Sequence, residues 1–308
     1  MTFPQLDECT RLTRLEPPAE GARLSMVLDT DTYNEIDDQF ALAYSLLSTE
    51  RLDVEAVYAA PFDNPRSDGP EDGMEKSYEE ILRILDRMGR SPESFAFKGA
   101  RRYLPAADEP VLSPAVEDLV ERAMAERDGL LCVVPIGAIT NIASAILARP
   151  EIIDRIVVAW LGGQPHAWMS AWEFNLKQDL HATRVILDSG VPFVHVPCTN
   201  VAQHITTTRA ELNAHITGHN PLGDYLFKVF DDFADDHFAR AKVIWDLAPV
   251  AWLINADWVP TVLTHTPLLT EMVTWSHDRS RHLMREAIGC DRNAIFADLF
   301  RKIARFSA

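Results

Sequence analysis

The sequence predicts a single α/β domain built on a mainly parallel open sheet with helices on both faces. Apolar, β-rich segments alternate with segments of helical periodicity over most of the chain, which is typical of βαβ units. The expected strands are apolar on both faces, as parallel strands covered by helices are. With 308 residues and 47% hydrophobic residues, the chain is long enough to build a full core.

The first two thirds of the chain contain the regular alternation. We expect strands at 25–28, 54–60, 95–98, 130–136, 155–161 and 193–197. Between them we expect helices at 38–47, 73–88, 114–125, 139–148 and 180–189. Asp179 is placed to cap the N-terminus of the last of these helices, and Gly190 to end it.

The pattern changes after residue 201 but shows no linker, so one domain is predicted for 25–308. Helices are expected at 209–216, 221–238 and 246–254, followed by strand-like runs at 263–270, 271–275 and 284–288. A last helix begins at Arg292, with Asp291 as its cap. Residues 1–24 are expected to form an extension and 61–73 a loop, both beside the edge of the sheet where ligands bind.

Composition limits the possible partners. A net charge of −17 and a pI near 4.9 argue against nucleic-acid polymers and anionic membrane surfaces, which would be repelled. No signal-peptide core and no apolar stretch near 18 residues is found, so a soluble, cytoplasmic protein with a small-molecule substrate is expected. The four cysteines form no C-x-x-C pair and are expected to be reduced thiols.

A dense acidic segment lies between the first apolar strand and the helix that follows it. Five carboxylates fall within residues 29–38, namely Asp29, Asp31, Glu35, Asp37 and Asp38. Because like charges repel and raise one another's pKa, such a cluster favours a hard cation with oxygen ligands. The sequence therefore predicts a metal-binding loop at the carboxyl end of the strand. An acidic turn that supplies charge to the helix N-terminus is the open alternative.

Three further segments carry polar groups that suit the same site. Residues 133–142 form a strand that ends in a glycine turn, where a backbone carbonyl is available as a cation ligand. Glu173 and Asn175 offer a carboxylate and an amide, and Asp246 begins a helix. Each segment also has a purely structural interpretation, as a tight turn, a capping group and a helix N-cap respectively.

The four segments together resemble the inosine–uridine-preferring nucleoside hydrolases, in the right order and spacing from about 25 to 255. Asp31, Asp37 and Asp38 resemble the family's acidic signature, 135–141 its G-P-L-T-N turn, 173–175 its E-F-N segment, and 245–249 its H-D-P-L-A segment. The resemblance implies the nucleoside hydrolase fold, a bound Ca²⁺ and a homodimer or homotetramer. It also implies cleavage of the N-glycosidic bond of a ribonucleoside.

The resemblance also assigns roles to individual residues. It implies that Ca²⁺ is held by the carboxylates of Asp31, Asp38 and Asp246 and by the backbone oxygen of Ile136. It implies that Glu173 and Asn175 bind the ribose and that Asp37 is the general base. These roles suit an oxocarbenium-like transition state, because carboxylates around the sugar stabilise its positive charge.

The chain departs from the family in the half of the site that binds the base. Trp245 stands where the family has a histidine, and an indole N–H cannot hand over a proton to a leaving group. The family's asparagine before E-F-N falls near Ala167, flanked by His166 and Trp168. Asn64 is a candidate for another asparagine of the family, the one after the second strand.

Two residues are candidates for the missing acid. His237 is the first, because it follows Phe227, Phe230 and Phe233 at helical spacing upstream of Trp245. Simple core packing is the alternative for that stripe. His166 is the second candidate. Stacking on a nucleobase and ordinary packing both remain open for Trp168, Trp172 and Trp245.

Two other functions compete with the hydrolase. A calcium-dependent nucleoside or ribose binder would keep the sugar site and lack turnover, but such a binder has no use for the base Asp37. A haloacid-dehalogenase-type phosphohydrolase would explain Asp29 and Asp31 after an apolar strand. This chain, however, shows neither the lysine nor the later acidic pair that such a phosphohydrolase requires.

Overall fold

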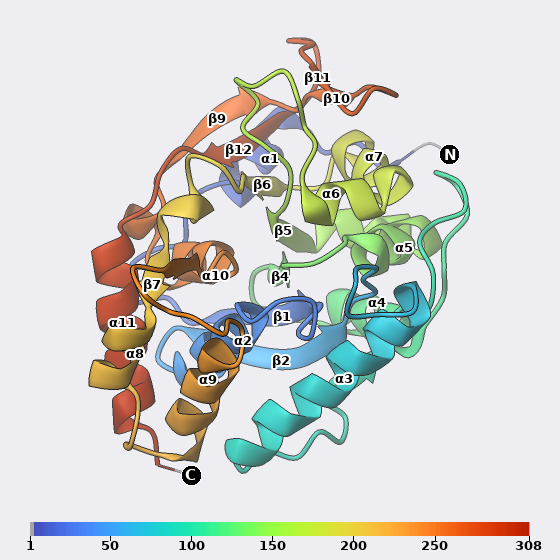
Figure 1. The fold of residues 1–308 in the computed structure, drawn as a ribbon. Coiled ribbons are helices and arrows are strands. Elements are labelled where there is room, and N and C mark those ends of the chain that lie inside the picture. Colours follow the sequence, from blue (N-terminus) through green and yellow to red (C-terminus); the bar gives the residue numbers. More distant parts are fainter. Residues whose placement is uncertain (1–2, 308) are drawn as a thin grey trace.

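The computed structural model describes residues 3–307 and contains one large sheet. The sheet has eight strands in the order β3-β2-β1-β4-β5-β6-β12-β9, and all neighbours run parallel except β9, which is antiparallel to β12 (Figure 1). The strands are β1 (Leu24–Thr30), β2 (Leu52–Ala59), β3 (Ala96–Lys98), β4 (Leu131–Pro135), β5 (Ile156–Leu161), β6 (Phe193–Val196), β9 (Thr261–His265) and β12 (Leu283–Ala287).

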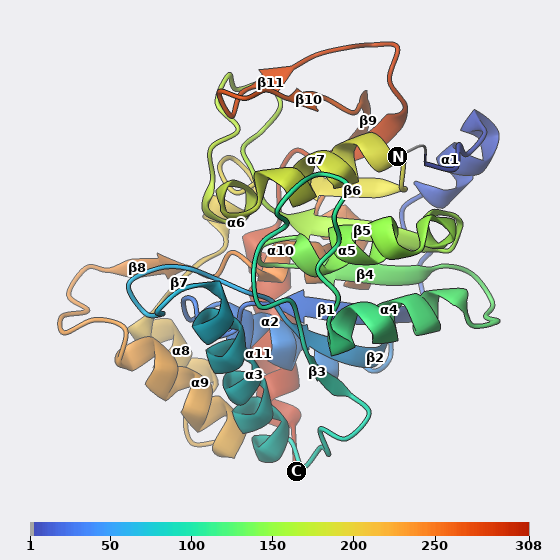
Figure 2. The same ribbon diagram turned by 90° about the vertical axis from the view of Figure 1, so that its right-hand side faces the viewer.

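Helices cover both faces of this sheet. The helices are α1 (Glu8–Arg14), α2 (Asp38–Leu47), α3 (Pro70–Arg87), α4 (Pro114–Met124), α5 (Thr140–Ala148), α6 (Phe174–Gln178), α7 (Leu180–Ser189), α8 (Arg209–His215), α9 (Pro221–Asp231), α10 (Leu247–Ile254) and α11 (Arg292–Arg305). Figure 2 brings α4, α5 and α7 in front of the sheet. Figure 1 shows α2, α10 and α11 on its other side.

Smaller elements complete the chain. Short 3-10 helices are η1 (Pro150–Asp154), η2 (Ala202–His204) and η3 (Ala256–Trp258). Two antiparallel ribbons pair β7 (Thr206–Thr208) with β8 (Ala241–Val243) and β10 (Leu268–Leu269) with β11 (Trp275–Ser276).

The two faces of the sheet bury two separate hydrophobic cores. Along β1, Met26 and Leu28 belong to the core under α2, α10 and α11, whereas Val27 belongs to the core under α4, α5 and α7. Successive side chains of a strand point to opposite faces, so β1 is apolar on both. This confirms the mainly parallel, doubly covered sheet that the sequence predicts.

The strand order changes direction between β1 and β4, and this point fixes the place of the site. The chain proceeds from β1 outward through β2 and β3, then returns to β4 on the other side of β1. In open α/β sheets, ligands bind at such a switch point, beyond the carboxyl ends of the strands. The backbone N–H of Ile136 donates to the carbonyl of Asp29 (2.8 Å), so the two loops leave the sheet side by side.

The predicted helix over 221–238 is wrong in its second half, because α9 ends at Asp231. Asp231, Asp232, Asp235 and Asp236 follow one another closely there, and carboxylates are unfavourable at the negative end of the helix dipole. Phe233 and His237 therefore do not continue a helical stripe. A strand over 271–275 was also expected, but the chain turns there and only Trp275 begins β11.

The first residues lie elsewhere than expected. Residues 8–14 form helix α1, and the guanidinium of Arg11 donates to the carbonyl of Gly190 (2.5 Å), just before β6 begins. Leu15 is fully buried. Because Gly190 is at the amino end of a parallel strand, α1 lies at the end of the sheet opposite to the switch-point edge. No helix within residues 3–307 is long and apolar enough to cross a membrane.

Candidate active site

A cavity of about 330 Å³ opens at the switch point between β1 and β4. Nine of the twelve predicted site residues line it: Asp31, Asp37, Asp38, Asn64, Ile136, Glu173, Asn175, Trp245 and Asp246. They come from loops after β1, β2, β4 and β5 and from the turn before α10. The fold therefore gathers segments that are far apart in the sequence into one pocket.

The floor of the cavity is a cluster of buried carboxylates. Oxygens of Asp37, Asp38 and Asp246 lie within 4.8 Å of one another, and none of these residues is more than 3% exposed. The hydroxyl of Thr30 donates to Asp38 Oδ1 (2.6 Å). The backbone N–H of Trp245 donates to Asp37 Oδ2 (3.2 Å). These bonds orient the carboxylates but leave much of their charge without compensation.

Burial raises the pKa of each of these carboxyl groups. The pKa of Asp37 rises to about 7 and that of Asp38 to about 6, because burial disfavours the charged form. The pKa values of Asp31 and Asp246 move in the same direction through burial and their acidic neighbours. Both carboxylate oxygens of Asp31 are buried and find no hydrogen-bond donor in the described part of the chain. An oxygen-rich, anionic set of this kind fits a hard divalent cation.

Close backbone packing brings the two loops of the switch point together. An added Cβ at Gly137 would lie 2.8 Å from the carboxyl carbon of Asp31, so only glycine fits at this position. The indole N–H of Trp160 donates to the carbonyl of Gly137 (3.0 Å) and holds the turn in place. The carbonyl of Ile136 accepts from Asn175 Nδ2 (2.8 Å), and its second lone pair remains as an acceptor.

Glu173 and Asn175 are fixed by the start of α6. Glu173 caps this helix: its Oε1 accepts from the backbone N–H of Asn175 (3.0 Å), and its Oε2 accepts from those of Leu176 (3.1 Å) and Gly163 (2.7 Å). Burial raises its pKa, and these three N–H groups oppose the shift. Glu173 therefore caps α6, as the structural interpretation of this segment predicts, and also lines the cavity.

Three predicted site residues do not line the cavity. His166 is buried against Glu286 and His195. Trp168 is 41% exposed on the loop between β5 and α6. His237 lies beyond the end of α9, where its Nε2 donates to the carbonyl of Asp231 (2.9 Å) and its ring stacks on Phe230. The structure thus brings neither candidate for the missing acid into the cavity lining.

Several residues of the site were not predicted. Asn141 donates to Asp29 Oδ2 (2.7 Å) and to the carbonyl of Ala59 (3.3 Å), which ties the acidic strand end to its neighbours. Lys242 on β8 makes an ion pair with Glu35 and is the largest favourable charge on Asp37. Cavity-lining residues also missed are Asn34, Glu35, Leu161, Gln164, Phe174, Cys198 and Thr199.

Three of these had a signal in the sequence, because Glu35 belongs to the acidic segment, Phe174 to the segment 173–175 and Asn141 to the turn at 135–141. Asn141 directly follows Thr140 at the start of the helix after the glycine turn, and a polar pair at a helix start after a buried strand points to the ligand-binding edge. Lys242 lies on a short strand of the β7–β8 ribbon, and nothing in the sequence brings it near residue 35.

Comparison with known proteins identifies the family of this chain. The family described as inosine-uridine preferring nucleoside hydrolase matches residues 26–296 of the chain. The pyrimidine-specific ribonucleoside hydrolase RihA of Escherichia coli O81 (strain ED1a) is 28% identical over 276 residues, which cover 78% of this chain and 82% of RihA. The protein of the same name from Enterobacter sp. (strain 638) is 27% identical over 271 residues, with the same coverage.

Solved structures share the fold at lower identity. A plant nucleoside hydrolase, the PpNRh1 enzyme, superposes with a TM-score of 0.74 at 18% identity, covering 92% of this chain and 99% of that one. The purine-preferring ribonucleoside hydrolase from Gardnerella vaginalis gives a TM-score of 0.69 at 20% identity, covering 91% and 98%. The family match over most of the chain shows that this protein belongs to the inosine-uridine preferring nucleoside hydrolases, enzymes that hydrolyse the N-glycosidic bond of ribonucleosides.

Proposed function

We propose that this hydrolase depends on Ca²⁺ and that Asp37 activates the attacking water. The observation that carries the proposal is the set of buried carboxylates at the switch point, with two Asp31 oxygens that have no donor among residues 3–307. Asp31, Asp38 and Asp246 would hold the cation through carboxylates and Ile136 through its carbonyl. When bound, Ca²⁺ would supply positive charge to the site and coordinate the 2′- and 3′-hydroxyls of the ribose and a water.

In this proposal Asp37 takes a proton from the attacking water. Its Oδ2 accepts the backbone N–H of Trp245, which fixes the orientation of the carboxylate. Burial raises its pKa to about 7, and Lys242 is the strongest influence against this rise. A base with a pKa near the working pH transfers protons efficiently, and such transfer contributes roughly 10²–10⁴-fold to a rate.

Glu173 and Asn175 complete the sugar site. They line the same cavity as the carboxylate cluster, and α6 holds them rigidly. Positive charge that develops on the ribose in the oxocarbenium-like transition state is stabilised by the surrounding carboxylates. Asn64 reaches the cavity from the loop after β2, where its Nδ2 donates to Asn34 Oδ1 (2.6 Å).

The cavity lining also includes aromatic and neutral polar side chains. These are Trp245, Phe174, Gln164 and Thr199. An indole stacks on a nucleobase but gives it no proton. We therefore propose that the leaving group departs without a histidine acid. The homo-oligomeric state and a role in nucleoside salvage stay predictions.

The test is ribose release from inosine, uridine and p-nitrophenyl riboside, each with and without a calcium chelator. If all three substrates are cleaved and the chelator abolishes this cleavage, the calcium site is supported and another proton donor must act in the cavity. Cleavage of p-nitrophenyl riboside alone, again sensitive to the chelator, supports a site without a leaving-group acid. Release that is unaffected by the chelator overturns calcium dependence. Saturable nucleoside binding without any release overturns the hydrolytic proposal.

The Asp37→Ala variant tests the base. We expect ribose release to fall by roughly 10²–10⁴-fold, because proton removal from water is lost. Calcium binding, measured by isothermal titration calorimetry, should persist because Asp31, Asp38 and Asp246 remain. Full activity of Asp37→Ala would rule out its role as the base.

A further inference from the structure

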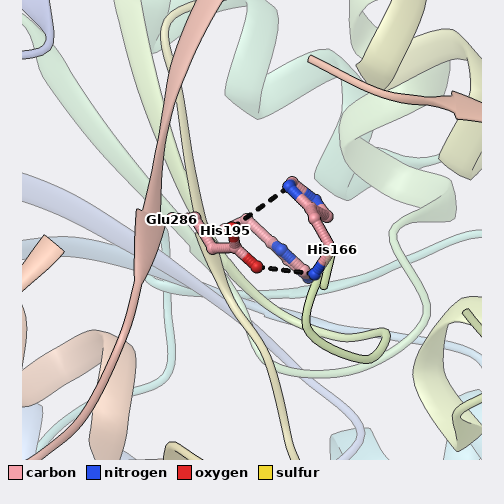
Figure 3. Close-up of side chains that lie close together, drawn as sticks. All are labelled: His166, His195 and Glu286. Atoms are coloured by element: carbon pink, nitrogen blue, oxygen red, sulfur yellow. Dashed lines mark hydrogen bonds and ion pairs between the residues drawn. The ribbon is translucent and has the colours of Figure 1, made fainter. Parts of the chain in front are cut away.

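A second cluster of metal-binding side chains lies outside the carboxylate site. His166 from the loop after β5, His195 on β6 and Glu286 on β12 offer ligand atoms that all lie within 4.8 Å of one another. Figure 3 shows the three side chains lying close together, with Glu286 next to both histidines. His166 is 4% and His195 1% exposed. The proposed hydrolytic chemistry uses none of the three.

The hydrogen bonds of the cluster leave several lone pairs without a donor. His195 Nε2 donates to the carbonyl of Gly162 (2.6 Å), which fixes the tautomer and leaves Nδ1 as a bare acceptor. His166 Nδ1 lies 3.3 Å from Glu286 Oε2 without hydrogen-bond geometry, and neither of its ring nitrogens has a hydrogen-bond partner among residues 3–307. Buried polar nitrogens without partners are costly, and a cation can bind the lone pair of His195 Nδ1 and the one lone pair of a neutral His166 ring.

The types of ligand atom point the same way. The bond from His195 Nε2 to Gly162 leaves Nδ1 with the lone pair through which an imidazole binds metals. Glu286 supplies the carboxylate of the cluster. Its only ion pair within the described residues is the one with His166. Two imidazoles and one carboxylate are a ligand set that Zn²⁺ uses in proteins.

The backbone around the cluster is held firmly. Glu286 Oε1 accepts the backbone N–H of His166 (2.7 Å), and His277 Nε2 donates to the carbonyl of His166 (3.1 Å). The ring of Trp275 packs edge-on against His166 and His195, at 5.0 and 5.9 Å between centroids. An apolar cover and fixed ligand backbones favour a defined site, because they limit solvent access and ligand movement.

The side chains need one rearrangement before they coordinate an ion. The His166 and His195 rings stack with centroids 4.7 Å apart and 13° between their planes, so one ion cannot lie in both ring planes. His195 is pinned by Gly162, whereas rotation of His166 about its Cβ–Cγ bond breaks no hydrogen bond of the ring. His166 is therefore the ligand that turns.

We propose that His166, His195 and Glu286 form a site for a transition-metal dication of the zinc class, separate from the carboxylate site. Such an ion links β6 and β12 to the loop that carries Gln164 into the active cavity. The site is structural in this proposal: it stabilises that loop and takes no part in bond cleavage. The competing state is the metal-free contact between His166 and Glu286.

The first test measures zinc in tag-free protein that is dialysed with zinc and an excess of Ca²⁺. Plasma emission spectroscopy should find about one zinc per chain in the unaltered protein. His195→Gln and Glu286→Gln should each lose it, whereas His219→Gln, which alters an exposed histidine, should retain it. Asp38→Asn should also retain zinc while calcium binding is lost. Zinc that stays in both His195→Gln and Glu286→Gln overturns the assignment.

A second test uses the unaltered protein alone, since buried variants sometimes fail to fold. Co²⁺ added in the presence of Ca²⁺ should give the visible d–d absorption of a site with nitrogen ligands, and Zn²⁺ should displace it. Zn²⁺ should also raise the unfolding temperature. Absence of the Co²⁺ bands, with no stabilisation by Zn²⁺, overturns the proposal and favours the metal-free contact. Calcium-dependent ribose release by the same zinc-free protein would show that the hydrolytic function stands regardless.

Discussion

At the scale of single residues, Gly137 shows how little room the carboxylate site leaves. A Cβ at this position would lie 2.8 Å from the carboxyl carbon of Asp31 and 3.0 Å from its Oδ1. We expect Gly137→Ala to displace Asp31, because neither the backbone nor the buried carboxylate has space to yield, at a cost of roughly 1–3 kcal/mol. The loss of calcium-binding free energy, measured by titration calorimetry, should exceed the loss of folding free energy, measured by unfolding.

The matched control is Gly289→Ala. Its added Cβ would meet nothing closer than Pro260 at 4.0 Å, so calcium affinity should not change. Unaltered calcium affinity in Gly137→Ala would mean that Asp31 does not bind the ion.

Lys242 provides a second prediction, on the electrostatics of Asp37. Burial opposes the charge of Lys242, but Asp37 and Glu35 keep its pKa above the ordinary value. In Lys242→Met the pKa of Asp37 should rise, because the main influence that lowers it is removed. A higher pKa leaves less of the base ionised in acid, so kcat/KM should fall more at pH 6 than at pH 8.

The pH profile of ribose release measures this effect. Lys228→Met serves as the control, because Lys228 makes an exposed ion pair with Asp232, for which little energy is expected. A profile of Lys242→Met that coincides with that of the control would show that Lys242 does not act on the base.

Sequence separation distinguishes the site residues that were predicted from those that were not. Asp31, Asp37 and Asp38 stand together in one loop, and the spacing of their carboxylates is visible in one dimension. Lys242 and Glu35 are 207 positions apart and meet only because the fold brings β8 next to the loop after β1. Long-range pairs of this kind follow from the tertiary structure and have no local signal.

At the scale of elements, strands and helices of the parallel sheet were predicted closely and the elements outside it less so. The strand predicted at 155–161 is β5 (Ile156–Leu161), and the helix predicted at 139–148 is α5 (Thr140–Ala148). Both are buried over nearly their whole length, and most of their side chains are apolar. By contrast, α9 has a periodic sequence that extends past its acidic end, and the periodicity alone did not reveal where it stops.

Helix α1 yields a prediction at this scale. Leu15, which follows it, is fully buried, so Leu15→Ala should destabilise the protein by roughly 2–5 kcal/mol through the cavity it leaves. Activity per folded molecule should not change, because α1 contacts Gly190 and β12 rather than the active cavity. Denaturant unfolding measures the first effect and ribose release the second.

Leu112→Ala is the reference for this substitution, since Leu112 is 62% exposed and its removal should cost little. Equal stability of the two variants would show that residues 8–15 contribute nothing to the folded domain. They would then be the extension that the sequence suggested.

For the whole molecule, the carboxylate cluster should make calcium binding, stability and pH interdependent. The folded pKa values of Asp37 (about 7) and Asp38 (about 6) exceed the value of about 3.9 expected in the unfolded chain. Between about pH 4 and pH 7 the calcium-free folded protein therefore holds protons that the unfolded chain releases, and these groups lower its stability as pH rises through this range. In the proposed function, Ca²⁺ would take the place of those protons.

We therefore expect the stabilisation by Ca²⁺ to be larger at pH 8 than at pH 5.5. The measurement is the difference in unfolding temperature between calcium-loaded and chelator-treated protein across this range. Asp38→Asn removes one of the repelling charges, so without calcium it should be more stable than the unaltered protein at pH 8, and calcium should stabilise it little. A calcium effect that is the same at both pH values would mean that the cluster does not exchange protons for the ion. The carboxylates would then have to be compensated from within the protein.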